Sequence, residues 1–291
     1  MEHSPYTDIL HRMRDDLVLR GLSPRTVDSY LTHARLFLAW CARPTDTLDT
    51  EDIRRFLAAL IAEHDLAPST VNIYSAAIRF LFAVTLNHPL NYLQIPRQKE
   101  PDTLPVVLHR TEVAAILAQA AVPQHRALLT LIYGSGLRIS EAAAMKVPPI
   151  DSAAMRVRVV GGKGSQDRYT LLSKAALTAL REYWRACRPQ HPDGWLFPGS
   201  CPSGHITSAG IRFAFNQAVA RAQITSPVTV HTLRHCFATH LLEDGATLLQ
   251  IKELLGHRSI QSTTLYLHLA NLTAGLQSPL DAFTGQVAHG D

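Results

Sequence analysis

The chain has 291 residues, of which 46% are hydrophobic, and this composition is enough for two compact domains with apolar cores and excludes a disordered chain. The formal net charge is +4, and the basic residues comprise 23 Arg and 5 Lys. The basic excess lies in residues 101–291, because residues 1–100 are close to neutral. Arg presents a planar fork that pairs with phosphate oxygens through two hydrogen bonds, so this charge suits nucleic acid without establishing it.

Cysteine spacing and hydropathy disfavour several other classes of protein. The four Cys residues are far apart and form no C-x-x-C pair, which argues against a zinc cluster and a disulfide framework. The first ten residues carry charged side chains and no apolar signal segment, and no window approaches the 18 apolar residues of a membrane span. We therefore expect a cytoplasmic protein with reduced thiols and no membrane association.

The N-terminal third is predicted to be helical. Ser23 followed by Pro24 is typical of a helix N-terminus, because Ser caps the helix and Pro is tolerated at its first position. Apolar residues then recur every three or four positions as far as Trp40, and the same pattern begins again after Pro68. A shorter amphipathic pattern lies between the two. These patterns predict an all-helical domain over residues 1–95.

The remaining chain is predicted to form a linker and a second domain. Residues 96–105 hold three prolines and several charges, which is typical of an interdomain linker. The second domain, residues 106–291, begins with helical periodicity that breaks at Gly134-Ser-Gly136. Residues 155–159 alternate apolar and basic, as a half-buried strand does, and Arg168–Leu172 predicts the returning strand.

Glycines in the turn between these strands place Lys163 at the tip of a predicted β-hairpin. Beyond the hairpin, helices are predicted over residues 175–187, 231–242 and 248–255, the last opened by a capping box and stopped by Gly256. The predicted fold class is therefore mainly α, with a small antiparallel β-sheet in the second domain.

Six side chains of the second domain could act together on one bound group: Arg138, Lys163, His231, Arg234, His257 and Tyr266. His231 and Arg234 are three residues apart on a predicted helix, so they share one face. The stretch HTLRHCFATHLL at residues 231–242, followed by Gly-His257 and Tyr266, resembles the signature of the tyrosine recombinase (phage integrase) family. Gly-Leu-Arg138-Ile-Ser-Glu resembles the first arginine motif of that family, and Gly-Lys163-Gly resembles its hairpin lysine.

The likeness spans nearly the whole chain, because residues 1–95, with Gly-Leu-Ser-Pro-Arg-Thr26, resemble the helical, SAM-like core-binding domain of the family. It implies a DNA clamp domain followed by a catalytic domain whose C-terminal tail packs onto a neighbouring protomer. Leu276, Leu280 and Phe283 give that tail an apolar surface. Length and plan are most similar to Xer-like and simple transposon-encoded recombinases.

The resemblance also implies roles for the six residues. Tyr266 is the nucleophile that forms a 3′-phosphotyrosyl ester, while Arg138, Arg234 and His257 donate to the phosphate. A phenol with an ordinary pKa of about 10 needs a proton acceptor, and His231 is the candidate base or proton-positioning group. Lys163 is the candidate general acid for the departing 5′ oxygen. No metal ion or cofactor is expected, because transesterification exchanges one phosphodiester for another.

Neighbouring side chains receive supporting or ordinary roles. Glu141 follows Arg138 by three residues and could orient that guanidinium from behind. His235, His240 and His268 are interpreted as ordinary surface or core residues, and Cys236 as a small buried side chain without a catalytic role.

The expected partner is double-stranded DNA with short inverted-repeat core sites, bound by a homo-tetramer or by a hetero-tetramer with a paralogous recombinase. Strand exchange through a Holliday junction would serve integration or excision of a mobile element, or resolution of DNA dimers, in a nucleoid-associated protein. Two alternatives stay open on the sequence: DNA relaxation like that of a type IB topoisomerase, and a non-catalytic DNA-binding regulator.

Overall fold

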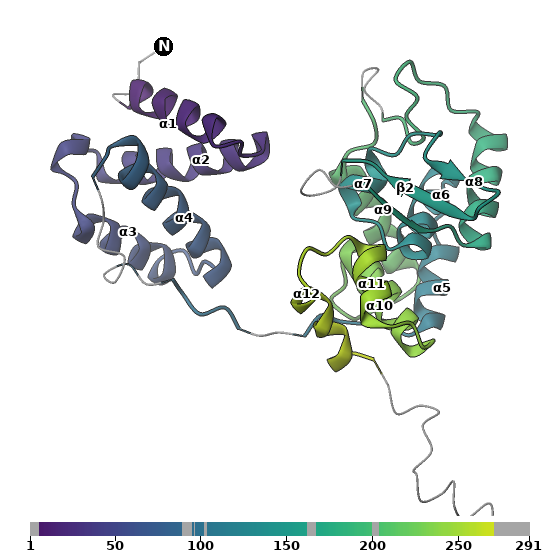
Figure 1. Cartoon of the computed structure of the whole chain (residues 1–291). Coiled ribbons are helices and arrows are strands. Elements are labelled where there is room, and N and C mark those ends of the chain that lie inside the picture. Colours follow the sequence, from purple (N-terminus) through teal and green to yellow (C-terminus); the bar gives the residue numbers. More distant parts are fainter. Residues whose placement is uncertain are drawn as a thin grey trace, which may run out of the picture. The chain divides into compact units, whose positions relative to one another are not determined.

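The computed structural model divides the chain into two compact units, Met1–Asp102 and Thr103–Asp291 (Figure 1). It describes residues 6–88, 95, 97–101, 104–161, 167–199 and 204–270. Lys163 and the apolar tail positions Leu276, Leu280 and Phe283 lie outside these residues. The described elements are mainly helices with one small antiparallel sheet, which is the fold class expected from the sequence.

The first unit is a helical bundle. Its elements are α1 (Thr7–Leu19), α2 (Pro24–Cys41), the 3-10 turn η1 (Thr45–Thr47), α3 (Thr50–Ala62), α4 (Pro68–Phe80) and the π-helical turn η2 (Leu81–Thr85). The predicted start of α2 is confirmed, because Ser23 Oγ accepts a hydrogen bond from the Thr26 amide at 3.2 Å. Phe37 meets Phe56 and Phe82 edge-on in the core, with ring centroids 5.3 and 6.0 Å apart.

Part of the proline-rich segment is attached to the first unit. The amide group of Asn72, on α4, donates to the Gln98 carbonyl and to the Glu100 carboxylate at 3.0 Å, and its oxygen accepts from the Gln98 amide at 2.9 Å. Asn72 is buried, so these bonds satisfy a polar group that has left water. The proline content and charge of the segment do not predict these contacts with α4.

The second unit combines helices with a three-stranded sheet. Its elements are α5 (Arg110–Ala118), α6 (Pro123–Ser135), α7 (Ile139–Ala143), β1 (Ile150–Asp151), β2 (Arg156–Val159), β3 (Arg168–Leu171), α8 (Lys174–Cys187), α9 (Ser208–Arg221), α10 (Val230–Glu243), α11 (Leu248–Leu255), α12 (Gln261–Thr264) and the 3-10 turn η4 (Leu265–His268). The strand order is β1-β2-β3, and both pairs are antiparallel. β1 has only two residues, too few to show an alternating pattern in the sequence.

The register of β2 and β3 decides which side chains face the core. Val157 pairs with Thr170 and Val159 pairs with Arg168. Both valines are buried while the alternating residues Arg156 and Arg158 are exposed, as the alternation in the sequence predicted. Arg168 therefore lies on the face of β3 that points into the protein.

The motif-bearing helix α10 crosses the core of the second unit, against α6, α9, α11 and η4. His240, expected to be an ordinary surface or core residue, lies in the core, with its ring nitrogens bonded to the Tyr133 hydroxyl at 2.9 Å and the Leu108 carbonyl at 3.1 Å. The buried thiol of Cys236 accepts from the Leu108 amide at 3.2 Å. No described helix is long and apolar enough to cross a membrane.

Gly136 ends α6 in the left-handed conformation, with φ of 62°. A Cβ there would lie 2.4 Å from Phe237 Cδ1, on α10. We expect Gly136→Ala to lower the free energy of unfolding for two reasons. An alanine in the left-handed conformation costs about 1–2 kcal/mol, and overpacking against Phe237 costs roughly 1–3 kcal/mol more. Gly194→Ala is the matched control, because Gly194 has φ of 70° and nothing within 4 Å of its added Cβ. Urea denaturation measures both, and equal losses would contradict the packing argument.

Candidate active site

Arg138 lies at the start of the short helix α7, where two hydrogen bonds to Glu141 hold it in place. The Glu141 carboxylate accepts from the Arg138 amide at 2.8 Å and from its guanidinium Nη1 at 2.7 Å. This arrangement closes the first turn of α7 and orients the arginine, as expected from the three-residue spacing. The Arg138 side chain is 24% exposed, so it is reached by solvent, unlike the buried Glu141.

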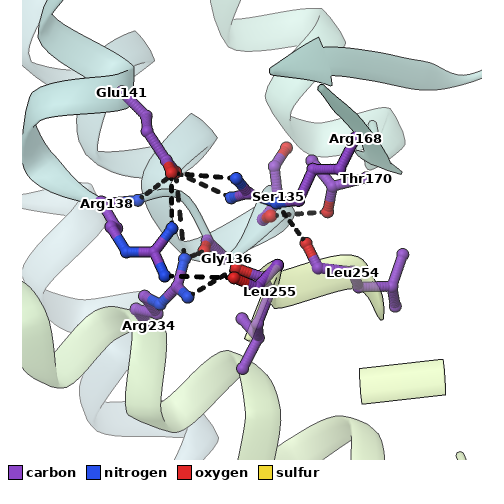
Figure 2. Close-up of polar contacts among 10 residues, drawn as sticks. Ser135, Gly136, Arg138, Glu141, Arg168, Thr170, Arg234, Leu254 and Leu255 are labelled. Atoms are coloured by element: carbon purple, nitrogen blue, oxygen red, sulfur yellow. Dashed lines mark hydrogen bonds and ion pairs between the residues drawn. The ribbon is translucent and has the colours of Figure 1, made fainter. Parts of the chain in front are cut away.

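A second arginine holds the same carboxylate. Arg168, on β3, donates from Nη1 and Nη2 to the two oxygens of Glu141 at 2.9 and 2.7 Å, in a bidentate pair (Figure 2). Its Nε also donates to the Leu254 carbonyl at the end of α11, at 2.8 Å. Arg168 therefore joins the sheet, α7 and α11 through one side chain.

Arg234 approaches from α10 and is 1% exposed. Its two terminal nitrogens donate to the carbonyls of Gly136 and Leu255, each at 2.7 Å. Its Nη1 also lies 3.9 Å from Glu141 Oε2. Figure 2 shows the guanidinium groups of Arg138, Arg168 and Arg234 all turned toward this carboxylate.

Arg138, Arg168, Arg234 and Glu141 form a cluster with three cationic groups and one anionic group. Burial raises the pKa of Glu141, but the hydrogen bonds and charges of Arg168 and Arg138 outweigh it and lower that pKa to about 2. Burial, with Arg138 beside it, lowers the pKa of Arg234 to about 10, so this arginine stays charged at neutral pH. The excess of positive charge favours a bound anion, and the planar forks suit a phosphate group.

Tyr266, on η4, packs beside this cluster and is 2% exposed. Its hydroxyl oxygen lies 3.3 Å from Nδ1 of His235. Burial raises the pKa of Tyr266, whereas Arg234 and Arg138 act in the opposite direction. The phenol is therefore protonated at neutral pH, next to cations that would stabilise its ionised form.

His257 lies flat against Tyr266. The two ring planes differ by 13°, with centroids 6.4 Å apart. Nδ1 of His257 bonds the buried hydroxyl of Thr263 at 3.0 Å, which fixes the orientation of the imidazole. Burial, reinforced by Arg234, lowers the pKa of His257 to about 4, so it is neutral at pH 7.

His231 and His235 lie one turn apart on α10. Their rings meet edge-on, with centroids 4.6 Å apart and an angle of 84° between the planes. Desolvation lowers the pKa of His231, and the charges of Arg234 and Arg138 add to this effect. Because Arg234 and Arg138 are close enough to affect the pKa of His231, this imidazole belongs to the same cluster.

The structure brings together Arg138, Glu141, His231, Arg234, His257 and Tyr266, which were expected to share one site. Lys163 lies outside the described residues. No group of three or more His, Cys, Asp or Glu that could hold a metal ion occurs in the described part of the chain.

Sequence reasoning missed two members of the cluster, Arg168 and His235. Arg168 shares a strand face with Thr170, and its cross-strand partner Val159 is buried. The alternation of the two strands therefore indicated that the Arg168 side chain would point into the protein. His235 follows His231 by four residues, which places both on one helix face, but nothing else in the sequence distinguishes it from an ordinary surface or core histidine.

Comparison with known proteins identifies the family to which the chain belongs. The model of the phage integrase family matches residues 107–272, and the model of the phage integrase N-terminal SAM-like domain matches residues 9–92. A putative integrase/recombinase of Sinorhizobium fredii is 42% identical over 279 residues, covering 94% of this chain and 89% of that protein. A tyrosine recombinase XerD of Rhizobium meliloti is 32% identical over 272 residues, with 86% of each chain covered.

Solved structures share the fold. The XerH site-specific recombinase in a pre-cleavage complex with its difH substrate has a TM-score of 0.71 at 20% identity, over 91% of this chain and 82% of that chain. A lambda integrase dimer bound to a core site has a TM-score of 0.71 at 17% identity, over 93% and 97% of the two chains. The chain belongs to the phage integrase family. It is a tyrosine recombinase, an enzyme of site-specific DNA recombination.

Proposed function

We propose that Tyr266 attacks a DNA phosphodiester held by Arg138 and Arg234, and that the chain thereby cleaves and rejoins strands at specific sites. The observation that carries the proposal is the gathering of three arginines around the buried carboxylate of Glu141, with Tyr266 and three histidines close to Arg234. The two arginines supply permanent positive charge where the attacked phosphate gains negative charge. Each such donor typically contributes about 2.7–4 kcal/mol to transition-state stabilisation.

The remaining side chains take roles that fit their chemistry. His257 donates a further hydrogen bond to the phosphate, and His231 is the proton-positioning group beside the two arginines. Lys163 protonates the departing 5′ oxygen, because a flexible ammonium group can deliver a proton at that point. Glu141 and Arg168 hold the arginines in place without touching the reacting atoms. The product is a 3′-phosphotyrosyl ester, which the 5′ hydroxyl of a partner strand reverses.

The assembly on DNA is proposed on the same basis. Residues 1–95 act as a helical clamp and residues 106–291 as the catalytic domain, joined by the proline-rich segment. The substrate is duplex DNA with short inverted repeats, and four copies, or two copies with a paralogous recombinase, exchange strands through a Holliday junction. The structures of XerH and lambda integrase on DNA support a duplex partner. Association with the nucleoid follows from this substrate.

The test traps the covalent intermediate. A pool of nicked duplex oligonucleotides is made from the DNA on both sides of the gene, where short inverted repeats are expected. A nick near the cleaved bond releases a short fragment, so the adduct cannot rejoin. We expect an adduct that survives SDS and maps to Tyr266 by mass spectrometry. Folded wild-type protein that forms no adduct with any member of the pool would overturn the proposal.

A plain supercoiled plasmid without the captured repeat separates recombination from topoisomerase activity. We expect the plasmid to stay supercoiled, because a site-specific enzyme cleaves only where its protomers assemble on their repeats. Relaxation of the plain plasmid would assign the same tyrosine chemistry to a topoisomerase instead.

A further inference from the structure

The hydroxyl of Tyr266 has a hydrogen-bond partner that the six-residue signature does not include. Nδ1 of His235 lies 3.3 Å from the hydroxyl oxygen, and the ring centroids are 5.9 Å apart. No other hydrogen bond to this hydroxyl occurs in the described part of the chain. The atom that would attack phosphorus is therefore within reach of an imidazole nitrogen.

Neither of the other two histidines, His231 and His257, has a hydrogen bond to the Tyr266 hydroxyl in the part of the chain that the structure describes. Nδ1 of His257 bonds Thr263, and its ring faces the Tyr266 ring rather than the hydroxyl. His231 contacts the ring of His235 edge-on. His235 therefore lies between His231 and the nucleophile, and it is the histidine whose nitrogen meets the phenol.

The surroundings of His235 keep its imidazole neutral. Arg234 on α10 is a permanent cation, His231 lies one turn away, Tyr266 meets the ring from η4, and His257 is close enough for the two imidazoles to interact electrostatically. Burial, then His231 and Arg234, lower the pKa of His235 to about 4. A neutral imidazole carries one nitrogen that accepts a hydrogen bond, and a phenol is a natural donor to it.

We propose that His235 is the catalytic residue that accepts the Tyr266 proton, through Nδ1, during strand cleavage. The inference rests on the proposed function, in which Tyr266 is the nucleophile. As the bond from the tyrosine oxygen to phosphorus forms, the hydroxyl proton passes to Nδ1, the bond to the 5′ oxygen breaks, and Lys163 protonates that oxygen. Rejoining reverses each transfer, so His235 returns the proton to Tyr266. The phosphate gains negative charge in the same step, which offsets the new charge on the imidazole.

The first test needs no DNA. Nitrogen-15 NMR of the full-length protein distinguishes the two neutral tautomers of a histidine and its cationic form. We expect His235 at pH 7 to carry its proton on Nε2 and an unprotonated Nδ1. A proton on Nδ1, or a cationic His235 at pH 7, would overturn the proposal, because neither form can accept the phenol proton.

The second test measures single-turnover cleavage of the duplex that the wild-type protein captures from the nicked pool. We expect His235→Ala to slow cleavage by roughly 10²–10⁴-fold, the usual contribution of a positioned base. His235→Asn is the decisive variant, because its side-chain oxygen can keep the hydrogen bond of Nδ1 but cannot take up a proton. It should be about as slow as the alanine variant. His268→Ala, an exposed histidine on the same turn as Tyr266, is the control and should cleave at the wild-type rate.

Rescue separates proton acceptance from a structural role. A fluorinated tyrosine at position 266 has a more acidic phenol and needs less help to ionise, so it should restore part of the rate lost in His235→Ala. Recovery of full activity by His235→Asn, or no effect of the fluorinated residue in a variant that still binds the duplex, would overturn the proposal. Wild-type protein without any adduct would contradict the proposed function instead, and an unaffected His235→Ala variant would contradict this inference alone.

Discussion

Replacing Tyr266 by Phe is expected to abolish the SDS-resistant adduct while DNA binding is retained. Phe lacks the oxygen that bonds phosphorus, so no phosphotyrosyl ester can form. The ring is buried and stacks on His257, and Phe keeps both the volume and this contact. The measurement pairs adduct formation on the captured duplex with a mobility-shift titration at several salt concentrations, since phosphate contacts make binding salt-dependent.

The same variant addresses the interpretation as a non-catalytic regulator. If DNA binding were the whole activity, wild-type and Tyr266→Phe proteins would be indistinguishable in every assay. An adduct formed by the Phe variant would instead assign the nucleophile to another side chain. His268→Ala provides the control, because it changes an exposed residue of the same turn and should leave the adduct unchanged.

Glu141→Gln is expected to destabilise the second unit by about 3–5 kcal/mol, the usual effect of breaking a buried ion pair. The Glu141 side chain is 7% exposed and accepts from Arg138 and Arg168. Gln has nearly the same shape but no charge, so the three guanidinium groups around it would lose their only nearby anion among the described residues. Urea denaturation at pH 7 measures the loss.

Asp167→Asn is the matched control, because Asp167 also pairs with an arginine, Arg158, at 2.6 Å. Those side chains are 40% and 52% exposed, and an exposed ion pair contributes little to stability because solvent screens it. Equal losses in the two variants would contradict the importance of burial at Glu141.

The effect of Glu141 also has a predicted pH dependence. Its pKa in the folded protein is about 2, below the ordinary 4.5, so its carboxylate stabilises the fold above pH 4.5. That contribution, about 3 kcal/mol from the pKa difference, is lost as the pH falls from 4.5 toward 2. The unfolding free energies of wild-type and Glu141→Gln proteins should therefore converge over this range. A difference that stays constant down to pH 2 would show that the variant acts through shape.

Much of the fold was predictable because local signals agreed with the tertiary structure. The Ser23 cap, the Gly256 stop and the β2 alternation each have a cause within a few residues, and each is confirmed. The six residues proposed for the site were selected for another reason: their order and spacing resemble a family pattern. Each of them taken alone is an ordinary Arg, Lys, His or Tyr.

The parts that escaped prediction depend on contacts between distant segments. Asn72 bonds Gln98 across 26 residues, and Arg168 reaches Glu141 across 27 and Leu254 across 86. The importance of His235 also depends on such a contact, since Tyr266 meets it across 31 residues. Periodicity shows which face of an element is apolar, but it does not show which polar group will lie opposite that face.

The pair between Arg168 and Glu141 has a consequence for how this enzyme could be altered. Arg168 follows Lys163 by five residues, so a fully extended chain keeps the two Cα atoms within roughly 18 Å of each other. The carboxylate that orients Arg138 therefore also anchors the strand leading from the lysine. Changes of hairpin length between Val159 and Arg168 are expected to move Lys163, the proposed proton donor, without moving the arginines, provided that Arg168 itself is kept. Hairpin grafts from other recombinases should accordingly begin after Val159 and end before this arginine.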